Sequence, residues 1–245
     1  MARWLFISDL HLTGERPEAN EQFFRFLNEE AAGAHALCVL GDLFEYWIGD
    51  DELDAPDGDP LAREAVRALR ALSDSGVELH FMHGNRDLLI GRTFAAAARI
   101  SLLEDPTVLP VAGVPTLLMH GDTLCTDDHD YQAWRRTARS PEWQREFLAA
   151  PLVERRKRIL QMREKSREVV AAKPAEIMDV NAGAVRDAFR THHVRRLIHG
   201  HTHRSAFHNV EVNGARCERW VLPDWYGDGG GYLTVDEMGA RLVSF

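Results

Sequence analysis

The sequence has few cysteines and no long apolar run. Its three cysteines, Cys38, Cys125 and Cys217, are widely spaced in a chain of 245 residues. Such a set argues against a disulfide framework and against a cysteine-based zinc site. No stretch approaches the roughly 18 apolar residues needed to span a bilayer, so an integral membrane protein is not expected. The first residues also lack the apolar run and cleavage site of a secretory signal. We therefore expect a globular protein of a reducing compartment.

Basic residues are fewer than acidic residues, and they are unevenly distributed along the chain. The chain has 29 Lys and Arg against 38 Asp and Glu, a net charge of −9, which argues against a nucleic-acid-binding protein. Residues 131–175 alone hold 12 Lys and Arg against 5 Glu. This segment either binds an anionic substrate or surface, or forms an ordinary solvated helix face. Charge alone leaves both interpretations open.

Short apolar runs alternate with helical patterns. The runs cover residues 4–7, 36–40, 77–82, 116–119 and 195–198, and their length and polar borders are typical of buried strands. Helices are predicted around residues 23–27 and 61–72, and further strands at 206–212, 216–221, 232–235 and 240–245. This order predicts an α/β fold in which two sheets form a sandwich flanked by helices.

Residues 128–179 interrupt this alternation. The segment is rich in Arg, Glu and Ala, contains no strand-like run, and is punctuated by Pro141, Pro151 and Pro174. Proline is tolerated in the first turn of a helix. We predict a core made of residues 1–127 and 180–245, with two or three inserted helices that form a cap over the active site.

Polar residues follow each of the five strand-like runs. The segments are 9–11 (Asp-Leu-His), 41–42 (Gly-Asp), 84–87 (Gly-Asn-Arg-Asp), 120–122 (His-Gly-Asp) and 199–203 (His-Gly-His-Thr-His). Loops at the carboxyl ends of strands in an α/β sheet converge on one crevice. Any single segment could be a turn or a helix cap, but five in this arrangement favour one shared site.

These residue types suit divalent metal ions. Alternate side chains of an extended segment share a face, so Asp9 and His11 can point the same way, as can His201 and His203. Mixed imidazole and carboxylate donors suit ions such as Mn²⁺, Fe²⁺ and Zn²⁺. A central carboxylate, Asp42, could bridge two ions about 3.5–4 Å apart, a pair that clamps a phosphoryl group and activates water.

The five segments together resemble the calcineurin-like metallophosphoesterases, which implies an αββα sandwich of two mixed sheets. The resemblance implies one ion held by Asp9, His11, Asp42 and His203, and a second held by Asp42, Asn85, His120 and His201. It implies a water between the ions as nucleophile, with Asn85, Arg86 and His120 as catalytic groups. Arg86 would neutralise the phosphate. His83, His199 and Asp122 either orient the ligands or have a core or turn role.

Three longer stretches, residues 41–51, 120–128 and 176–181, resemble the UDP-2,3-diacylglucosamine hydrolases of lipid A synthesis. This resemblance implies cleavage of the pyrophosphate of UDP-2,3-diacylglucosamine to UMP and 2,3-diacylglucosamine 1-phosphate (lipid X). It also implies two Mn²⁺ per chain and a peripheral position at the cytoplasmic face of the inner membrane. Substrate contacts map onto the following residues: Asn85, Arg86, Asp128, Ser166, Lys173 and His201. Val170 stands where that family has an Asn.

A diacylated diphosphate needs an apolar chamber with a cationic rim. Residues 155–158 (Arg-Arg-Lys-Arg) offer a basic cluster. Apolar surface could come from Trp134, Trp143, Phe147, Leu148, Leu152, Ile159, Leu160, Met162 and Val169, although ordinary helix packing explains each of them alone. We expect this set to line an acyl pocket and its outer face to touch anionic lipid. The alternatives are another metallophosphoesterase acting on nucleotides or phosphodiesters, and a metal-binding scaffold without activity. Neither a nucleic acid nor an obligate protein partner is expected.

Overall fold

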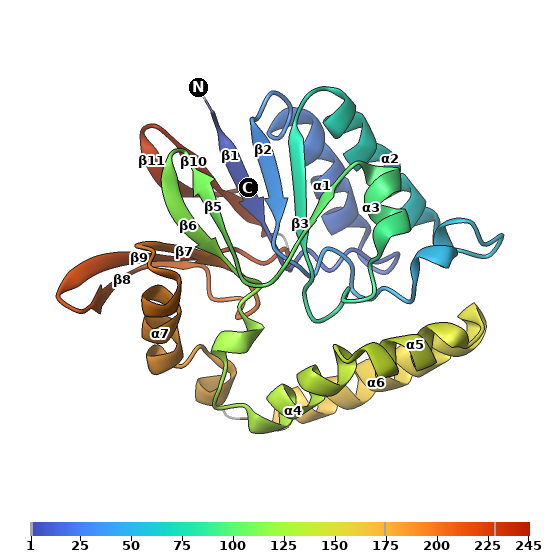
Figure 1. The fold of residues 1–245 in the computed structure, drawn as a ribbon. Helices are drawn as coiled ribbons and strands as arrows, with labels where there is room; N and C mark the ends of the chain where they lie inside the picture. The colour runs from blue at the N-terminus through green and yellow to red at the C-terminus, as the bar shows by residue number, and fades with distance from the viewer. Residues whose placement is uncertain (1, 174, 228) are drawn as a thin grey trace.

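The computed structural model describes residues 2–173, 175–227 and 229–245, without the side chains of residues 170–172, 175 and 176. Two sheets form its centre (Figure 1). The first has the order β11-β10-β1-β2-β3-β4 and the second has the order β5-β6-β7-β9-β8. The strands of the first sheet are β1 (Trp4–Ile7), β2 (Ala36–Val39), β3 (Glu78–Met82), β4 (Ser101–Leu103), β10 (Gly231–Asp236) and β11 (Gly239–Ser244). Those of the second are β5 (Thr107–Val111), β6 (Val114–Leu118), β7 (Arg196–His199), β8 (Ala206–Val212) and β9 (Ala215–Val221).

Apolar residues form three layers that hold the sandwich together. One cluster joins the first sheet to the helices α1 (Pro17–Glu29), α2 (Pro60–Asp74) and α3 (Arg92–Ala98). A second cluster, with Phe6, Leu118 and Ile198 at its centre, lies between the two sheets. A third packs α7 (Ala182–His192) on the second sheet through Val185 and Phe189. Alternating side chains of the central strands thus face two apolar layers. The predicted α/β fold with two mixed sheets is confirmed.

Strand direction brings the polar segments to one edge of the sandwich. Strands β1 to β4 are parallel to one another, and so are β6, β7 and β9. Their carboxyl ends therefore point the same way within each sheet. The loops that leave these ends lie on the side of the molecule where the inserted helices are found (Figure 1).

The inserted segment forms α4 (His129–Ala138), α5 (Pro141–Ala149) and α6 (Leu152–Ala172), followed by the short turn η3 (Ala175–Met178). Asp128 accepts a hydrogen bond from the Tyr131 N–H and so caps α4. Ser140 caps α5 through the Trp143 N–H, and Pro141 occupies the first turn, where a missing N–H costs nothing. The three helices lie below both sheets as a separate group (Figure 1). We refer to α4–α6 as the cap; the domain limits at residues 127 and 180 remain a prediction.

Some elements differ from the sequence-based expectation. The nine predicted strands are present with ends shifted by at most two residues, but β4, β5, α3 and α7 were not predicted. Strands β4 and β5 are edge strands, and Pro110 lies inside β5 opposite Pro115. Proline is confined to such edges because it cannot donate to a central ladder. Among the described residues, no helix combines the length and the apolar character needed to cross a membrane.

Candidate metal centre and its cap

Several residues of the five polar segments share an unusual backbone conformation. Asp9, His11, Asp42, His201 and His203 all have φ between 51° and 69°. Left-handed backbone is unfavourable for residues other than glycine, and it persists only where the surrounding structure enforces it. The loops that follow β1, β2 and β7 therefore turn sharply, which points these five side chains toward a common space. Alternation along an extended strand, which we expected to align them, is not the reason.

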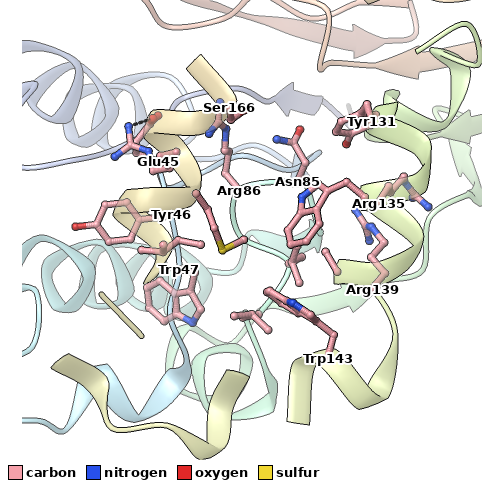
Figure 2. Close-up of a pocket in the computed structure, with 17 residues that line it drawn as sticks. Glu45, Tyr46, Trp47, Asn85, Arg86, Tyr131, Arg135, Arg139, Trp143 and Ser166 are labelled. Atoms are coloured by element: carbon pink, nitrogen blue, oxygen red, sulfur yellow. Dashed lines mark hydrogen bonds and ion pairs between the residues drawn. The ribbon is translucent and has the colours of Figure 1, made fainter. Parts of the chain in front are cut away.

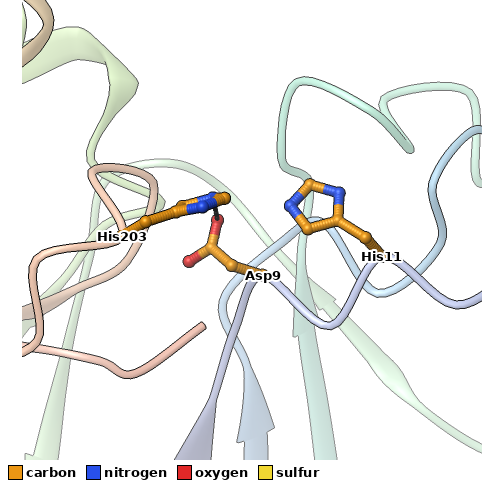
Figure 3. A group of neighbouring side chains, drawn as sticks. All are labelled: Asp9, His11 and His203. Carbon is orange, nitrogen blue, oxygen red and sulfur yellow. Dashed lines mark ion pairs between the residues drawn. The ribbon is translucent and has the colours of Figure 1, made fainter. Parts of the chain in front are cut away.

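One group consists of Asp9, His11 and His203, each with a potential ligand atom within 4.8 Å of the others (Figure 3). Asp9 Oδ2 accepts hydrogen bonds from Ser8 Oγ at 2.6 Å and from the His201 N–H at 2.8 Å. Asp9 Oδ1 has no hydrogen bond and lies 3.4 Å from His203 Nε2. One oxygen of the carboxylate is thus held by protein donors while the other faces the group.

A second group consists of Asp9, Asp42 and His120, which satisfy the same distance limit and are all buried. Asp42 Oδ2 lies 3.8 Å from His11 Nε2 and 3.9 Å from His120 Nε2. This carboxylate oxygen therefore stands between the two groups, where a bridging ligand is required.

Asn85 and His201 extend the second group. Asn85 Oδ1 lies 3.1 Å from His120 Nε2 and 3.0 Å from His201 Nδ1. The structure thus brings together all seven residues that we predicted as metal ligands: Asp9, His11, Asp42, Asn85, His120, His201 and His203.

The ring nitrogens that point away from the groups face oxygen atoms of the protein, through a hydrogen bond at His120 and at ion-pair distance at His11 and His203. His120 Nδ1 lies 2.9 Å from the Leu40 carbonyl oxygen. His11 Nδ1 lies 3.0 Å from a Glu45 carboxylate oxygen, and His203 Nδ1 lies 3.5 Å from Asp224. Carbonyl and carboxylate partners of this kind fix the tautomer and orientation of metal-binding imidazoles.

Charge in the site is dense and buried. Burial alone would lower the pKa of His120, but the carboxylates of Asp42, Asp122 and Asp9 together raise it to about 9. Burial, together with Asp42, raises the pKa of the nearby Asp87 carboxyl to about 7. Burial, with His120 next, lowers the pKa of His201 to about 4, which keeps that imidazole neutral and able to bind a cation.

The residues present fit two divalent ions. Asp9 Oδ1 and His11 Nε2 are buried without a hydrogen-bond partner, and leaving buried polar atoms unpaired is costly unless something else binds them. The donor set of imidazole, carboxylate and amide oxygen suits Mn²⁺, Fe²⁺ or Zn²⁺ and does not select one of them.

Comparison with known proteins agrees with this geometry. A family model described as calcineurin-like phosphoesterase matches residues 2–205. The chain belongs to the calcineurin-like phosphoesterases. Proteins named UDP-2,3-diacylglucosamine hydrolase are similar over nearly its full length. The one from Aromatoleum aromaticum is 48% identical over 239 residues, covering 98% of this chain and 95% of its own. The one from Klebsiella pneumoniae is 48% identical over 241 residues and covers 98% of both chains.

Solved structures are similar at a lower level. A structure described as an archaeal phosphodiesterase has a TM-score of 0.49 and 10% identity, with 99% of each chain covered. The Vps29 structure from Entamoeba histolytica, complexed with Zn²⁺, has a TM-score of 0.47 and 14% identity, with 99% of this chain and 98% of that chain covered.

In this phosphoesterase, a cavity lies between the core and the cap (Figure 2). Trp134, Trp143, Ile159 and Met162 line it from the cap. A second cavity borders the metal groups at His11, Asp42, His201 and His203. The two cavities share Asn85, Arg86, Tyr131 and Ser166, so the cap cavity opens beside the metal centre.

Only part of the predicted apolar set lines the cap cavity. Four of the nine side chains do so, as named above. Phe147 is buried in the core cluster of the first sheet and Leu152 packs against it. Leu148, Leu160 and Val169 are between 40% and 44% exposed. A helical segment whose apolar residues point in several directions cannot be assigned to one surface from the sequence.

The predicted basic rim needs a correction. Arg155 is buried and pairs with Asp51, and Arg156 donates to Glu52 at 2.8 Å. These two residues hold the cap to the core and do not line the cavity. The guanidinium groups that do line it belong to Arg86, Arg135, Arg139 and Arg163.

Of the predicted substrate contacts, some line the cavities and others are paired with each other. Ser166 lines both cavities together with Asn85 and Arg86. Lys173 Nζ donates to both Asp128 carboxylate oxygens, at 2.6 and 2.7 Å, so this pair is already bonded to itself. The side chain of Val170 lies outside the described residues.

The three residues left open by the motif analysis have protein partners. His83 Nε2 lies 2.7 Å from the Ile90 carbonyl oxygen. His199 accepts from Arg219 at its Nε2, at 3.2 Å. Asp122 accepts from the Tyr131 hydroxyl and from Arg135 Nε, both at 2.7 Å. Asp122 thereby links the His120 segment to α4.

Sequence reasoning missed several residues that contact the centre. The Tyr226 ring lies 5.2 Å from the His11 ring and 5.4 Å from the His203 ring. The Arg16 guanidinium lies 4.2 Å above the Tyr226 ring. Glu45 is the third missed residue. It lies three positions after Asp42. The signal available in the sequence was an acidic residue placed between two aromatic residues, Phe44 and Tyr46.

Proposed function

We propose that this phosphoesterase hydrolyses the pyrophosphate bond of UDP-2,3-diacylglucosamine and releases UMP and 2,3-diacylglucosamine 1-phosphate. The observation that carries the proposal is the 46–48% identity with proteins of that activity over 98% of the chain. Similarity of this extent includes the cap, which a match to the phosphoesterase core alone would leave unexplained.

The cavities support this substrate. A molecule with two acyl chains and a diphosphate needs apolar surface on one side of a phosphate site and polar surface on the other. The cap cavity offers aromatic and aliphatic side chains, and the second cavity borders the metal groups. Arg86 lies where the two meet, and its planar guanidinium suits bidentate binding of phosphoryl oxygens.

We assign one metal ion to Asp9, His11, Asp42 and His203, and the other to Asp42, Asn85, His120 and His201. When bound, such a pair supplies an activated water near neutral pH and positive charge beside the phosphoryl oxygens. Leu40 holds the His120 ring and Glu45 faces the His11 ring, so both imidazoles are oriented before an ion binds.

Further contacts are assigned to the rest of the headgroup. Ser166, on α6, faces the junction of the cavities and is placed to bind a polar group of the sugar phosphate. Lys173 and Asp128 are assigned to the same headgroup. Because they pair with each other, binding would exchange part of that pair for substrate hydrogen bonds.

Product analysis tests the proposal and the choice of Mn²⁺. The protein is treated with chelator, supplied again with Mn²⁺, Zn²⁺ or Mg²⁺, and incubated with UDP-2,3-diacylglucosamine or UDP-glucose. We expect UMP and the sugar 1-phosphate from the diacylated substrate only, with Mn²⁺ restoring the highest rate. Equal turnover of both substrates would remove the role of the cap cavity. Preference for a nucleotide or a simple phosphodiester would favour the alternative phosphoesterase activity.

We also propose that the outer face of α6 contacts anionic lipid. Val153 is 68% exposed and Leu160 is 44% exposed, one heptad apart on this helix. Lys157 is exposed between them on the same face. Apolar and basic side chains on one face are typical of helices that lie on membranes. Sedimentation with vesicles tests this contact: anionic vesicles should retain the protein, neutral ones should not, and Val153→Glu with Lys157→Glu should release it.

A further inference from the structure

Glu45 connects the metal centre to the cap. Its carboxylate is buried and lies at the edge of the cap cavity (Figure 2). One carboxylate oxygen, Oε2, lies 3.0 Å from Nδ1 of His11. The other, Oε1, accepts a hydrogen bond from Nη2 of Arg163, a residue of α6 that is 118 positions away in the sequence. A single side chain therefore contacts both a proposed metal ligand and a cap helix.

The His11 ring presents its two nitrogens to opposite neighbours. Nε2 faces Asp42 Oδ2 at 3.8 Å, on the side of the metal groups, and Nδ1 faces Glu45. An imidazole that binds a cation through Nε2 must carry its proton on Nδ1, and a carboxylate facing Nδ1 favours this tautomer. Glu45 is thus placed to orient the ring and to increase its basicity.

Arg163 is placed to keep Glu45 in this position. Both side chains are nearly buried, with 12% and 11% exposure, so their pairing is only weakly screened by solvent. A glutamate has three rotatable side-chain bonds. Without the Arg163 guanidinium, the carboxylate would gain more hydration by turning toward the cavity than by remaining at His11.

We propose that Glu45 is a positioning residue for His11 and that Arg163 holds Glu45 in place, so that the docking of α6 sets the geometry of one metal ligand. The inference rests on the proposed metal centre and adds to it a physical connection between cap position and metal affinity. Such a connection is reciprocal: loss of the Glu45–Arg163 pair weakens metal binding, and a bound ion favours that pair.

The same helix offers a matched control. Arg156 precedes Arg163 by seven residues, and its Nη2 donates to Glu52 of the core at 2.8 Å. Glu52 is nearly buried, as Glu45 is. Among the described residues, Glu52 pairs with Arg156 and with no proposed metal ligand. Arg156→Met therefore removes a cap–core ion pair of the same kind without touching the path to His11.

The test measures Mn²⁺ affinity in the absence of substrate. Isothermal titration of chelator-treated protein gives the dissociation constants of the wild type and of the variants Glu45→Gln, Arg163→Met, Arg163→Lys and Arg156→Met. Loss of outer partners of metal-binding histidines typically weakens metal affinity by about 10–100-fold. We expect Glu45→Gln and Arg163→Met to weaken one Mn²⁺ site by about 10-fold. Arg163→Lys should restore part of the loss, and Arg156→Met should leave the affinity unchanged.

A double variant separates this path from general loosening of the cap. If Arg163 acts through Glu45, Glu45→Gln combined with Arg163→Met weakens binding by about 10-fold, whereas independent effects would multiply to about 100-fold. Unfolding by urea in the presence of chelator checks that each variant remains folded.

Three results would overturn the inference. They are wild-type affinity in Arg163→Met, an equal loss in Arg156→Met, and tighter binding in Arg163→Met, which would mean that the charge of Arg163 outweighs its hold on Glu45. If the wild type itself binds no Mn²⁺, the proposed metal centre fails. If the wild type binds Mn²⁺ but the variants give one of the three results above, only the role of Glu45 and Arg163 fails, so the two failures can be told apart.

Discussion

Gly200 lies against the carboxylate of Asp9, and adding one methyl group there should damage the metal centre selectively. A Cβ at this position would stand less than 3.0 Å from Asp9 Oδ2 and Ser8 Oγ. Both atoms are held by the hydrogen bond between them, and Oδ2 also accepts from the His201 N–H. The backbone of Gly200 needs no positive φ, so Gly200→Ala acts through space alone. To reach ordinary contact, the carboxylate must move by roughly 1 Å, and a displacement of that size can cost about 100-fold in rate.

The variant should fold, with about 1–3 kcal/mol lost to overpacking. We expect its Mn²⁺ affinity to fall at least about 10-fold and UMP release to fall about 100-fold. Isothermal titration and the product assay measure the two losses, and urea unfolding measures stability. Gly14→Ala is the control, since a Cβ at Gly14 meets nothing within 4 Å. Wild-type metal affinity in Gly200→Ala would show that Asp9 is not a ligand, or that its loop yields without cost.

Three further changes have separate readouts. His120→Ala removes a proposed direct ligand, so Mn²⁺ affinity and UMP release should each fall at least about 100-fold, beyond the effect of outer partners, in a protein that stays folded by circular dichroism. Met162→Glu puts a charge into the cap cavity and should lower kcat/KM for the diacylated substrate about 10-fold or more, while hydrolysis of a small chromogenic phosphodiester is kept. Mn²⁺ at 100 times the dissociation constant of one site should stabilise the chelator-treated protein by about 2.7 kcal/mol through that site, which raises Tm by roughly 5–11 °C in a scanning assay. An unchanged value in any of the three contradicts the corresponding assignment.

Much of the fold could be predicted because its central strands are short, apolar and bounded by polar turns. Strand β1 (Trp4–Ile7) and strand β8 (Ala206–Val212) match the predicted residues. The edge strands β4 and β5 were missed because an edge strand needs neither apolar side chains on both faces nor a backbone N–H at every residue. Its sequence therefore lacks the pattern of a buried strand. β4 has three residues, and β5 contains a proline.

The position of the metal groups followed from topology, but their detailed geometry did not. Five segments at strand ends must meet at one edge of the sheets, which the sequence could indicate. The left-handed backbone of Asp9 and Asp42 could not be foreseen, because non-glycine residues rarely adopt it and only the folded surroundings enforce it.

Contacts between the cap and the core were beyond sequence reasoning. Arg155 and Arg163 belong to one Arg-rich helix, and neither lies on a solvated face. Each is fixed by an acidic partner more than 100 residues away. Which arginine is buried depends on how α6 docks, and local periodicity carries no information about docking. The basic rim was therefore assigned to the wrong arginines.

The left-handed loops also determine how the metal centre should be mutated. Asp9→Ala and Asp9→Asn both remove the charge, but Asn adopts left-handed backbone more readily than Ala. Asn also keeps an oxygen for the two donors that Asp9 accepts, the Ser8 hydroxyl and the His201 N–H. Alanine leaves both unpaired, at about 1–3 kcal/mol for each buried group. We therefore expect Asp9→Ala to be less stable than Asp9→Asn by about 2–3 kcal/mol in urea unfolding with chelator present, whereas both lose Mn²⁺ binding. Equal stabilities would mean that neither the backbone conformation nor the two hydrogen bonds matters in the metal-free protein. A lower stability of Asp9→Ala would mean that part of the activity lost in an alanine variant reflects a disordered loop. Asparagine is then the substitution that isolates the loss of the ligand.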